Sequence, residues 1–477
     1  MGIKTRISGL KICWCLASIV IITASCNLLQ GNSSAVNSDG TLQRSISATL
    51  PGKSSQTSPS QFRSRPWFEG WCEQLEFIPF TNLGVQQIPD LDEPAPRVSF
   101  QDPIFGTCLV RVTDRSSDLD TGDASQGMKN EYSRVQSFNA DGTRLVIFTT
   151  DGNWYVYDAF SLQPLGQIPV EREPRWDAAD PDLLYYTEET RLVSYRLSTE
   201  QKRTIHEFAD DFPGQRLSAV WTKYEGSPSN DGRYWGLMAE NQDWMTVAFV
   251  IYDLEADQIV AVRETPPSEI DSVAISPKGN YFLVFYDNFC EHGQIGSDQE
   301  PCGLMVYDRT LQNGRGLLRI VGHTDLSLDA QGKEVLVYQD IDQDDISMLA
   351  LSSGEITPLL SIDFSHSALG FHFSGRAFRL PGWVLVSTSN GTRPPSTWMD
   401  DQIFALELQP GGHVVRFAHT HSVFDESIEH DYWAEPHAST NQDFTQIVFT
   451  SNWGKSGSDQ VDTYLIKLPK DWASQLP

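Results

Sequence analysis

Positive charge is scarce in this chain. Its 477 residues include 35 lysines and arginines against 63 aspartates and glutamates, for a formal net charge of −28. A surface of this sign repels nucleic acid phosphates and anionic lipid headgroups, which argues against both as partners. The sequence also lacks a nucleophile elbow, a P-loop and a dinucleotide fingerprint in a suitable context, so it does not point to the enzyme classes that use them.

The N-terminal apolar run is too short for a comfortable membrane span, because it covers only residues 12–24. Three basic residues precede it, as in a signal peptide. The run leads into Thr-Ala-Ser-Cys26, which resembles the lipobox of bacterial lipoproteins. In those proteins the chain is cut before the cysteine, which is then acylated. We expect a lipoprotein signal peptide over residues 1–25 and lipidation of Cys26; an ordinary secretory signal cut near Ala24 is the alternative.

Large apolar residues are rare between residues 26 and 65, where Ser, Asn, Gln and Thr dominate. Such a segment buries too little surface to offset its chain entropy. We interpret it as a disordered tether between a lipid anchor and the folded part. The expected location is therefore the periplasm or the cell surface, with contact to the membrane only through the anchor.

The seven cysteines include no CxxC and no Cys/His spacing that would favour a thiolate metal site. Two of them leave with the signal peptide, and four remain beyond Cys26, an even number in an exported chain. We predict one disulfide between Cys290 and Cys302, which flank a polar loop. A second, between Cys72 and Cys108, would attach the N-terminal segment to the fold.

No long helical period appears after about residue 100, and strand patterns with intervening turns recur instead. The clearest unit is VQSFNADGTRLVIFTTDGNWYVYD, residues 135–158. Its ending, Val-Tyr-Asp158, is nearly copied at Asp253 and Asp308. With four weaker copies this makes seven units of roughly 40–60 residues, a repeat length typical of β-propellers.

The repeats predict an all-β, seven-bladed β-propeller over residues 107–470. A four-stranded sheet cannot bury both of its faces alone, whereas a ring of sheets buries each face against a neighbour. The last unit shows only three strands, and TCLVRV (107–112) is a lone strand before the first unit. We expect that strand to complete the last blade and close the ring, with residues 66–106 packed on the propeller.

The turns Asn139-Ala-Asp-Gly142, Ser229-Asn-Asp-Gly232 and Ser276-Pro-Lys-Gly279 resemble the S-x-D-G turn of TolB-like propellers. The stretches GFHFSGRAFRLPGWVLVS and EPHASTNQDFTQIVFTSNWG are similar to the branch that contains oligogalacturonate lyases and exported propellers without a known activity. This resemblance implies a divalent metal held by propeller histidines and cleavage of uronate chains by β-elimination. It also implies that His437 is a ligand and that Arg175 or His372 assists proton transfer.

Seven of the ten histidines lie in the C-terminal quarter, and chain direction carries several of them to the face where propellers bind ligands. A transition metal needs imidazole or carboxylate ligands that converge on one point. The hypothesis is a Mn or Zn site made by His437, His372 and one of His419, His421 or His430. The alternative is that these histidines only satisfy hydrogen bonds at a blade junction.

The entries into several blades carry charged residues that we expect around the channel mouth. Glu173-Pro-Arg175 opens blade two as Glu435-Pro-His437 opens blade seven, and Glu225 and Asp325 open other blades comparably. The predicted mouth is polar and mixed in sign, with Arg175, Glu225, Asp325 and Glu435 as binding residues. Such a mouth is compatible with the binding of peptides or sugars and also with catalysis.

A weaker motif, Asp340-x-Asp342-x-Asp344, resembles a calcium loop but lacks the glycine and the distant glutamate of that loop. A solvated hairpin tip is the alternative. Two functions follow from the sequence. The leading one is a monomeric binding or scaffold module for a protein, peptide or cell-envelope glycan, without an enzyme activity. The other is a metal-dependent carbon–oxygen lyase that acts on uronate-containing oligosaccharides.

Overall fold

The computed structural model describes residues 76–366, 370–390, 394–425 and 429–476. Four predicted features lie outside this part and stay predictions: the signal peptide, the lipidation site Cys26, the tether over 26–65 and the pairing of Cys72. Within the described residues, no helix is long and apolar enough to cross a membrane.

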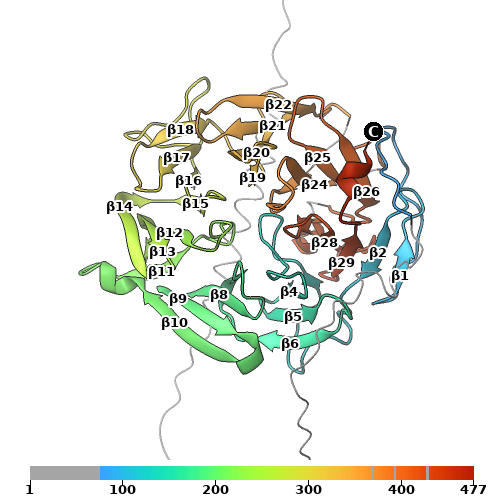
Figure 1. The fold of residues 1–477 in the computed structure, drawn as a ribbon, viewed down its shortest axis with the longest axis horizontal. Helices are drawn as coiled ribbons and strands as arrows, with labels where there is room; N and C mark the ends of the chain where they lie inside the picture. Colours follow the sequence, from blue (N-terminus) through green and yellow to red (C-terminus); the bar gives the residue numbers. More distant parts are fainter. Residues whose placement is uncertain (1–75, 367–369, 391–393, 426–428, 477) are drawn as a thin grey trace, which may run out of the picture. The chain divides into compact units, whose positions relative to one another are not determined.

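Seven antiparallel sheets surround a common axis, which makes the fold a seven-bladed β-propeller (Figure 1). The predicted fold class is thereby confirmed. Blade one comprises β3 (Met128–Lys129), β4 (Arg144–Thr149), β5 (Trp154–Asp158) and β6 (Pro164–Ile168). Blade two comprises β7 (Arg172–Trp176), β8 (Leu183–Glu188), β9 (Arg191–Arg196) and β10 (Gln201–Glu207). Blade three comprises β11 (Leu217–Trp221), β12 (Tyr234–Asn241), β13 (Thr246–Asp253) and β14 (Gln258–Ser268).

Blades four to six continue the pattern, each with its first strand next to the axis. Blade four comprises β15 (Ile270–Ile275), β16 (Tyr281–Tyr286), β17 (Leu304–Asp308) and β18 (Arg315–Leu318). Blade five comprises β19 (Thr324–Leu328), β20 (Glu334–Asp340), β21 (Asp345–Ala350) and β22 (Ile356–Ser361). Blade six comprises β23 (Gly370–Ser374), β24 (Trp383–Ser389), β25 (Gln402–Glu407) and β26 (Val414–His419). Short 3-10 turns are η1 (Leu197–Thr199), η2 (Phe208–Asp211), η3 (Glu429–Ala434) and η4 (Trp472–Gln475).

Blade seven closes the ring as the sequence predicts. Its strands β27 (Ser439–Thr440), β28 (Gln446–Ser451) and β29 (Asp462–Lys467) come from the C-terminus, and β2 (Cys108–Arg111) pairs with β29. The carboxylate of Asp462 is fully buried and lies 2.7 Å from Arg111 Nη2. This ion pair joins the two ends of the folded chain within one sheet.

The N-terminal segment adds what the sequence does not predict, a fifth strand. β1 (Ser99–Gln101) pairs with β2, so blade seven has five strands. Before β1, the chain crosses the outer edge of blade six, where Arg416 Nη1 donates to the carbonyl oxygens of Asn82 and Gly84. The outer strands of both blades are therefore covered rather than left as open edges.

Adjacent blades are held together by apolar contacts between their faces. Val146 and Val156 of blade one share a buried cluster with Leu184 of blade two. At the closure, Val110 of β2 packs in one cluster with Leu145 of blade one. Each such side chain contributes about 1.5–3 kcal/mol when fully buried, so ring closure rests mainly on these contacts.

The turns between first and second strands explain the S-x-D-G pattern. Gly142, Gly232 and Gly279 all have φ between 67° and 77°, a region that favours glycine. Asp231 Oδ1 accepts a hydrogen bond from the Arg233 amide, and Asp141 accepts one from Thr143 in the same way. These acids cap their turns, as expected.

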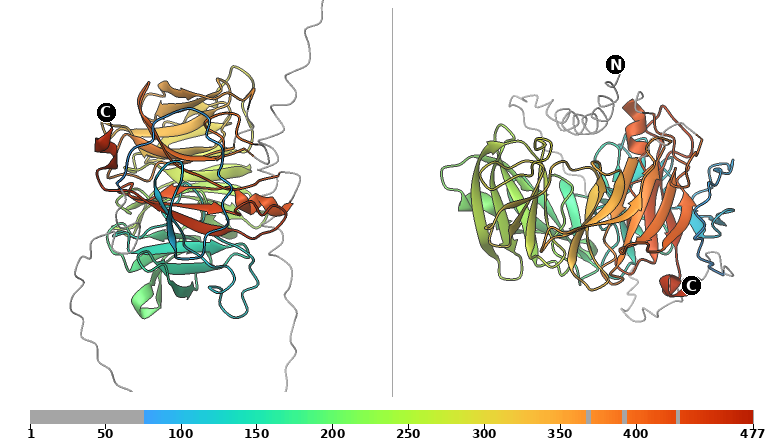
Figure 2. Two further views of the ribbon diagram at one scale, coloured as in Figure 1. Left: turned by 90° about the vertical axis from the view of Figure 1, so that its right-hand side faces the viewer. Right: turned by 90° about the horizontal axis from the view of Figure 1, so that it is seen from above.

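The propeller has two distinct faces. η3, which links blade six to blade seven, and η4, near the C-terminus, lie on opposite faces (Figure 2). We call the face with the blade-to-blade links the mouth face and the face with the S-x-D-G turns the turn face. A cavity of only about 50 Å³ lies near the axis on the turn face, where Gln136, Trp176 and Arg376 are among its lining residues.

Candidate metal centre

Three histidines from three consecutive blades meet near the axis. His323 immediately precedes β19, His372 lies within β23, and His437 precedes β27. The ring centroids of His323 and His372 are 4.4 Å apart, and those of His372 and His437 are 4.3 Å apart. The first strands of blades five, six and seven therefore bring together residues that lie far apart in the sequence.

Glu435 supplies a carboxylate to this group. Its Oε2 lies 3.0 Å from His437 Nε2 and 3.4 Å from His372 Nε2. One ligand atom from each of His372, Glu435 and His437 falls within 4.8 Å of the other two. Two imidazole nitrogens and a carboxylate oxygen form a donor set that suits a divalent transition metal.

Among these residues, His372 has the clearest features of a metal ligand. Its side chain is only 1% exposed, yet neither ring nitrogen has a hydrogen-bond partner. Burial, with His437 and His323 close by, holds the pKa of His372 well below its usual value. Burial also lowers the pKa of His437 well below the usual range and that of His323 to about 4. All three rings are neutral near pH 7, the state in which imidazole binds metals.

The first strand of blade one, β3, and the residues just after it form the opposite wall. The Tyr132 ring lies 4.7 Å from the His437 ring, and its hydroxyl lies 3.4 Å from His323 Nδ1. Lys129 Nζ lies 3.3 Å from His437 Nδ1. Burial lowers the pKa of Lys129 to about 8 and raises that of Tyr132 well above its usual value. An amine and a protonated phenol thus face the histidines.

The backbone at His437 is held in an uncommon conformation, with φ of 41°. Asn130 Nδ2 donates a 2.6 Å hydrogen bond to the His437 carbonyl, and Thr450 Oγ1 donates to Asn130 Oδ1. A positive φ in a non-glycine residue is uncommon and costs free energy. The surrounding hydrogen bonds fix the direction of the His437 side chain.

Pairs of acids and arginines lie near the axis beside the histidines. Burial raises the pKa of Glu131 and of Glu225 to about 7, although each faces an arginine. Burial likewise raises the pKa of Asp325. The pairs are Arg175–Glu131, Arg134–Glu225 and Arg376–Asp325. The binding residues predicted from sequence therefore lie close to the axis, but most of them already contact an opposite charge.

Arg175 is fixed by several acceptors at once. Besides Glu131, it donates to the carbonyl oxygens of Gly226 and Tyr224, at 2.9 Å each, and to that of Pro174 at 3.0 Å. Its side chain is therefore held in one position. A role for Arg175 in proton transfer stays a prediction.

The two Glu-Pro entries differ in what the glutamate contacts. Glu173 is 1% exposed and accepts hydrogen bonds from the amide of Thr222 and from the Thr222 hydroxyl. It also accepts a hydrogen bond from the Tyr224 amide, so it fastens blade two to the residues that follow the first strand of blade three. Glu435 instead faces His372 and His437. The same dipeptide thus serves a structural purpose in one blade and faces the candidate metal site in the other.

His421 and His419, which the sequence offered as further ligands, lie in a different group at the rim. The His421 ring stacks on Trp453 with centroids 4.1 Å apart, and the His419 ring lies 4.9 Å from Phe105. Neither belongs to the three-ligand group at the mouth, as found among the described residues. His430 falls in η3, and its side chain lies outside the described part of the structure.

The Asp340, Asp342 and Asp344 motif lies at the β20–β21 hairpin. Asp342 pairs with Arg319, and Asp340 Oδ1 accepts hydrogen bonds from the amides of Asp342 and Gln343. These contacts suit a hairpin tip, the alternative to a calcium loop. The predicted loop disulfide is present, because Cys290 and Cys302 are bonded. Cys108 is buried in β2, and its pairing with Cys72 stays a prediction.

Sequence reasoning missed His323, Tyr132 and Lys129. A signal for His323 existed, because it opens blade five in the same way that His437 opens blade seven. For Lys129 and Tyr132 no signal existed, since they precede the clearest repeat and match no motif. Their proximity to the histidines depends on the ring closing, which places blade one next to blade seven.

The comparisons with known proteins concern the fold. No protein-family model matches the chain, and no curated protein matches it in sequence. An oligogalacturonate lyase from Vibrio parahaemolyticus is similar in structure, with a TM-score of 0.53, 12% identity, and coverage of 78% of this chain and 97% of that one. An oligogalacturonate lyase in complex with manganese gives a TM-score of 0.52, 16% identity, and coverage of 82% and 100%. The chain is thus a seven-bladed β-propeller whose fold is similar to that of oligogalacturonate lyases.

Proposed function

We propose that this propeller binds a divalent transition metal through His372, Glu435 and His437 and acts as a carbon–oxygen lyase on uronate-containing oligosaccharides. The observation that carries the proposal is the buried imidazole of His372, which has no hydrogen bond at either nitrogen and lies beside Glu435 and His437. A buried polar group without a partner costs about 1–3 kcal/mol, which a bound metal offsets. The fold similarity to oligogalacturonate lyases supports the reaction class.

The donor set fits Mn²⁺ or Zn²⁺, because both accept imidazole nitrogen and carboxylate oxygen. When bound, such an ion polarises a uronate carboxylate and so acidifies the neighbouring C–H group. His323 lies beside this donor set, and its neutral ring suits a hydrogen bond to a sugar hydroxyl.

Lys129 and Tyr132 supply groups for the proton transfers of β-elimination. In that reaction a base removes the proton next to the carboxylate, the C–O bond to the leaving sugar breaks, and the leaving oxygen takes up a proton. Lys129 has a pKa of about 8, so a fraction of the amine is neutral near pH 7 and able to accept a proton. Tyr132 remains protonated because burial raises its pKa, which suits a proton donor.

A second candidate function is the binding or scaffold module for a protein, peptide or cell-envelope glycan. One observation favours it: the three arginines near the axis each contact an acid of the chain itself. In a lyase such arginines would serve to bind uronate carboxylates. In a binding module the metal anchors a carboxylated ligand, and no bond is broken.

A single assay separates these functions. The protein is loaded with Mn²⁺, dialysed, and incubated with polygalacturonate and other uronates with and without EDTA. A lyase releases an unsaturated product that absorbs near the ultraviolet edge, loses activity with EDTA, and regains it with Mn²⁺. Retained metal and uronate binding without product supports the binding module. A protein that retains no metal after dialysis contradicts the site itself.

We also propose that the chain is exported, anchored by lipid on Cys26, and monomeric. The signal-like N-terminus and the lipobox-like sequence support this. Expression in a bacterium with labelled palmitate is expected to label the wild type but not a Cys26→Ala variant. Label on the variant, or none on the wild type, argues for the ordinary secretory signal.

A further inference from the structure

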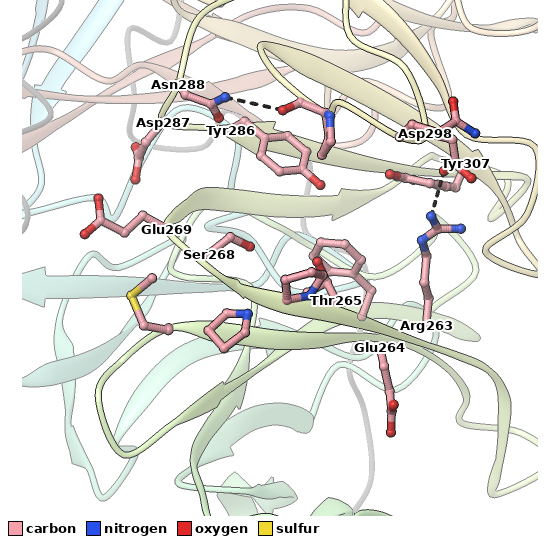
Figure 3. A pocket seen from close by; sticks show the side chains of 16 residues that line it. Arg263, Glu264, Thr265, Ser268, Glu269, Tyr286, Asp287, Asn288, Asp298 and Tyr307 are labelled. Atoms are coloured by element: carbon pink, nitrogen blue, oxygen red, sulfur yellow. Dashed lines mark hydrogen bonds and ion pairs between the residues drawn. The ribbon is translucent and has the colours of Figure 1, made fainter.

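A groove of about 620 Å³ lies between blades three and four, away from the histidine group (Figure 3). The end of β14, the link from β14 to β15, and the loop between β16 and β17 form its walls. We call it the blade 3–4 groove; its wall residues include Thr265, Pro266, Ser268, Glu269, Asp287 and Asn288. Its volume lies in the range that holds small ligands, about 300–1,000 Å³.

The walls of this groove are rigid. The Cys290–Cys302 disulfide ties together the two ends of the β16–β17 loop, and Cys290 N donates to the Arg319 carbonyl. Pro266 and Pro267 restrict the opposite wall, because proline fixes its own φ. A site that is formed in advance loses less entropy when a ligand binds.

One end of the groove is acidic. Arg263 is the only cation among the described residues that line it, and its Nη2 donates to Asp298 at 2.7 Å. That pairing leaves the carboxylates of Glu269 and Asp287, which lie at the same end in Figure 3. Burial, with Asp271 nearby, raises the pKa of Asp287 to about 6, so it is ionised at neutral pH. This end repels uronate carboxylates and attracts a cation.

Acceptor groups along the groove lack partners. Asp287 Oδ1 and Ser268 Oγ are buried atoms without a hydrogen bond in the structure. No three metal-ligating atoms converge here, as the described residues show, so a coordinated metal is not the favoured occupant. A lysine side chain satisfies a carboxylate, but its apolar stem offers neither a donor nor an acceptor to the buried Ser268 hydroxyl.

We propose that the blade 3–4 groove binds an unacetylated amino-sugar residue of a glycan, with its ammonium group between Glu269 and Asp287 and its ring hydroxyls on Ser268 and the neighbouring polar groups. The ammonium forms charge-assisted hydrogen bonds with the two carboxylates. The exposed Pro266 and Pro267 offer apolar surface to the carbon face of the ring. This site lies beyond the proposed lyase activity and shares no residue with the metal centre.

The test is isothermal titration of the full-length protein with glucosamine oligosaccharides at pH 7 and low salt. The N-acetylated oligosaccharide of the same length is the matched ligand, since it keeps the sugar rings and linkages and replaces the ammonium group with a neutral amide. Glucosamine oligomers are expected to bind at least ten-fold more tightly than the acetylated ones, and high salt is expected to weaken their binding. Equal affinity for both ligands overturns the proposal.

Two double variants, which lose the same negative charge, test whether the amino sugar binds in the blade 3–4 groove. Glu269→Gln with Asp287→Asn is expected to weaken glucosamine binding at least ten-fold. The control, Glu200→Gln with Glu355→Gln, makes the same change in charge at exposed positions on blades two and five and is expected to bind as the wild type does. Unchanged binding by the groove variant, or equal binding of an oligolysine peptide, contradicts an amino-sugar site. Metal content and melting temperature confirm that each variant is folded and report on the metal centre separately.

Discussion

Two groups of buried histidines lie in the same propeller, and they differ in what surrounds them. At the mouth, His372 and His437 face Glu435. At the rim, His419 and His421 lie beside each other with centroids 6.2 Å apart, and both have ring nitrogens without partners. Both groups therefore contain neutral imidazoles with nitrogens that lack hydrogen bonds, but among the described residues only the mouth group includes a carboxylate.

The difference lies in how the fold assembles each group. His419 and His421 are two residues apart, so local geometry alone places them together. The mouth histidines come from three blades, and only the closed ring brings them to one point. Convergence of distant residues around a carboxylate is thus a better indication of a metal site than a local concentration of histidines.

The largest expected difference between the two groups is in the amount of bound metal after one histidine is removed from each. His437→Ala is expected to reduce bound metal more than ten-fold, because a ligand is lost. His421→Ala is expected to leave metal content unchanged. Metal analysis after loading with Mn²⁺ and dialysis measures both. Loss only in His421→Ala would place the metal at the rim, and equal loss in the two variants would contradict a site at the mouth alone.

Removal of the carboxylate makes the mouth group resemble the rim group. Glu435→Gln is expected to weaken metal affinity at least about ten-fold, because a charged ligand becomes neutral, with little change in stability. The matched change Glu173→Gln is expected to leave metal affinity intact but to lower the free energy of unfolding by about 1–3 kcal/mol, because charge-assisted hydrogen bonds to Thr222 and Tyr224 are lost. Metal titration and urea unfolding separate the two effects. The reverse pattern would show that the two Glu-Pro entries are misassigned.

The fold could be predicted from the sequence because the repeats mark its strands and turns. The copied endings at Asp158, Asp253 and Asp308 and the glycine turns mark the strands, and the missing strand of the last unit predicts closure by residues 107–112. The fifth strand β1 could not be predicted in this way, since Ser99–Gln101 matches no repeat and pairs only because β2 presents an open edge.

The site was predicted only in part. His372, His437 and Glu435 were identified by their place at the start of blades, which is a repeat property. Lys129 and Tyr132 reach the site from the other end of the folded chain, a contact that no local pattern encodes. The third histidine also depended on distances between blades: the sequence offered His419, His421 or His430, and the structure brings His323 to the mouth instead.

Acid sensitivity is expected to reveal the rim group. Burial lowers the pKa of His419 to about 3 and that of His421 to about 4. Unfolded histidine titrates near 6.5, so between pH 6.5 and 3 the unfolded chain binds protons that the folded chain does not, and stability falls as the pH falls. At pH 4.5, His419 alone costs about 2–3 kcal/mol relative to pH 7. His419→Gln is expected to lose less stability over that interval, as measured by urea unfolding at both pH values on metal-loaded protein. An identical loss in wild type and variant contradicts the prediction.

Removal of an exposed histidine is expected to change the free energy of unfolding least. His413 is 41% exposed and its Nδ1 lies 2.8 Å from Glu407 Oε2. Surface ion pairs contribute only about 0–1 kcal/mol, because solvent screens them and both side chains lose entropy. His413→Ala is therefore expected to change the free energy of unfolding by less than about 1 kcal/mol and to leave metal content unaltered. A larger loss in urea unfolding would mean that exposure does not separate structural from functional histidines here, and the contrast between mouth and rim would then rest on Glu435 alone.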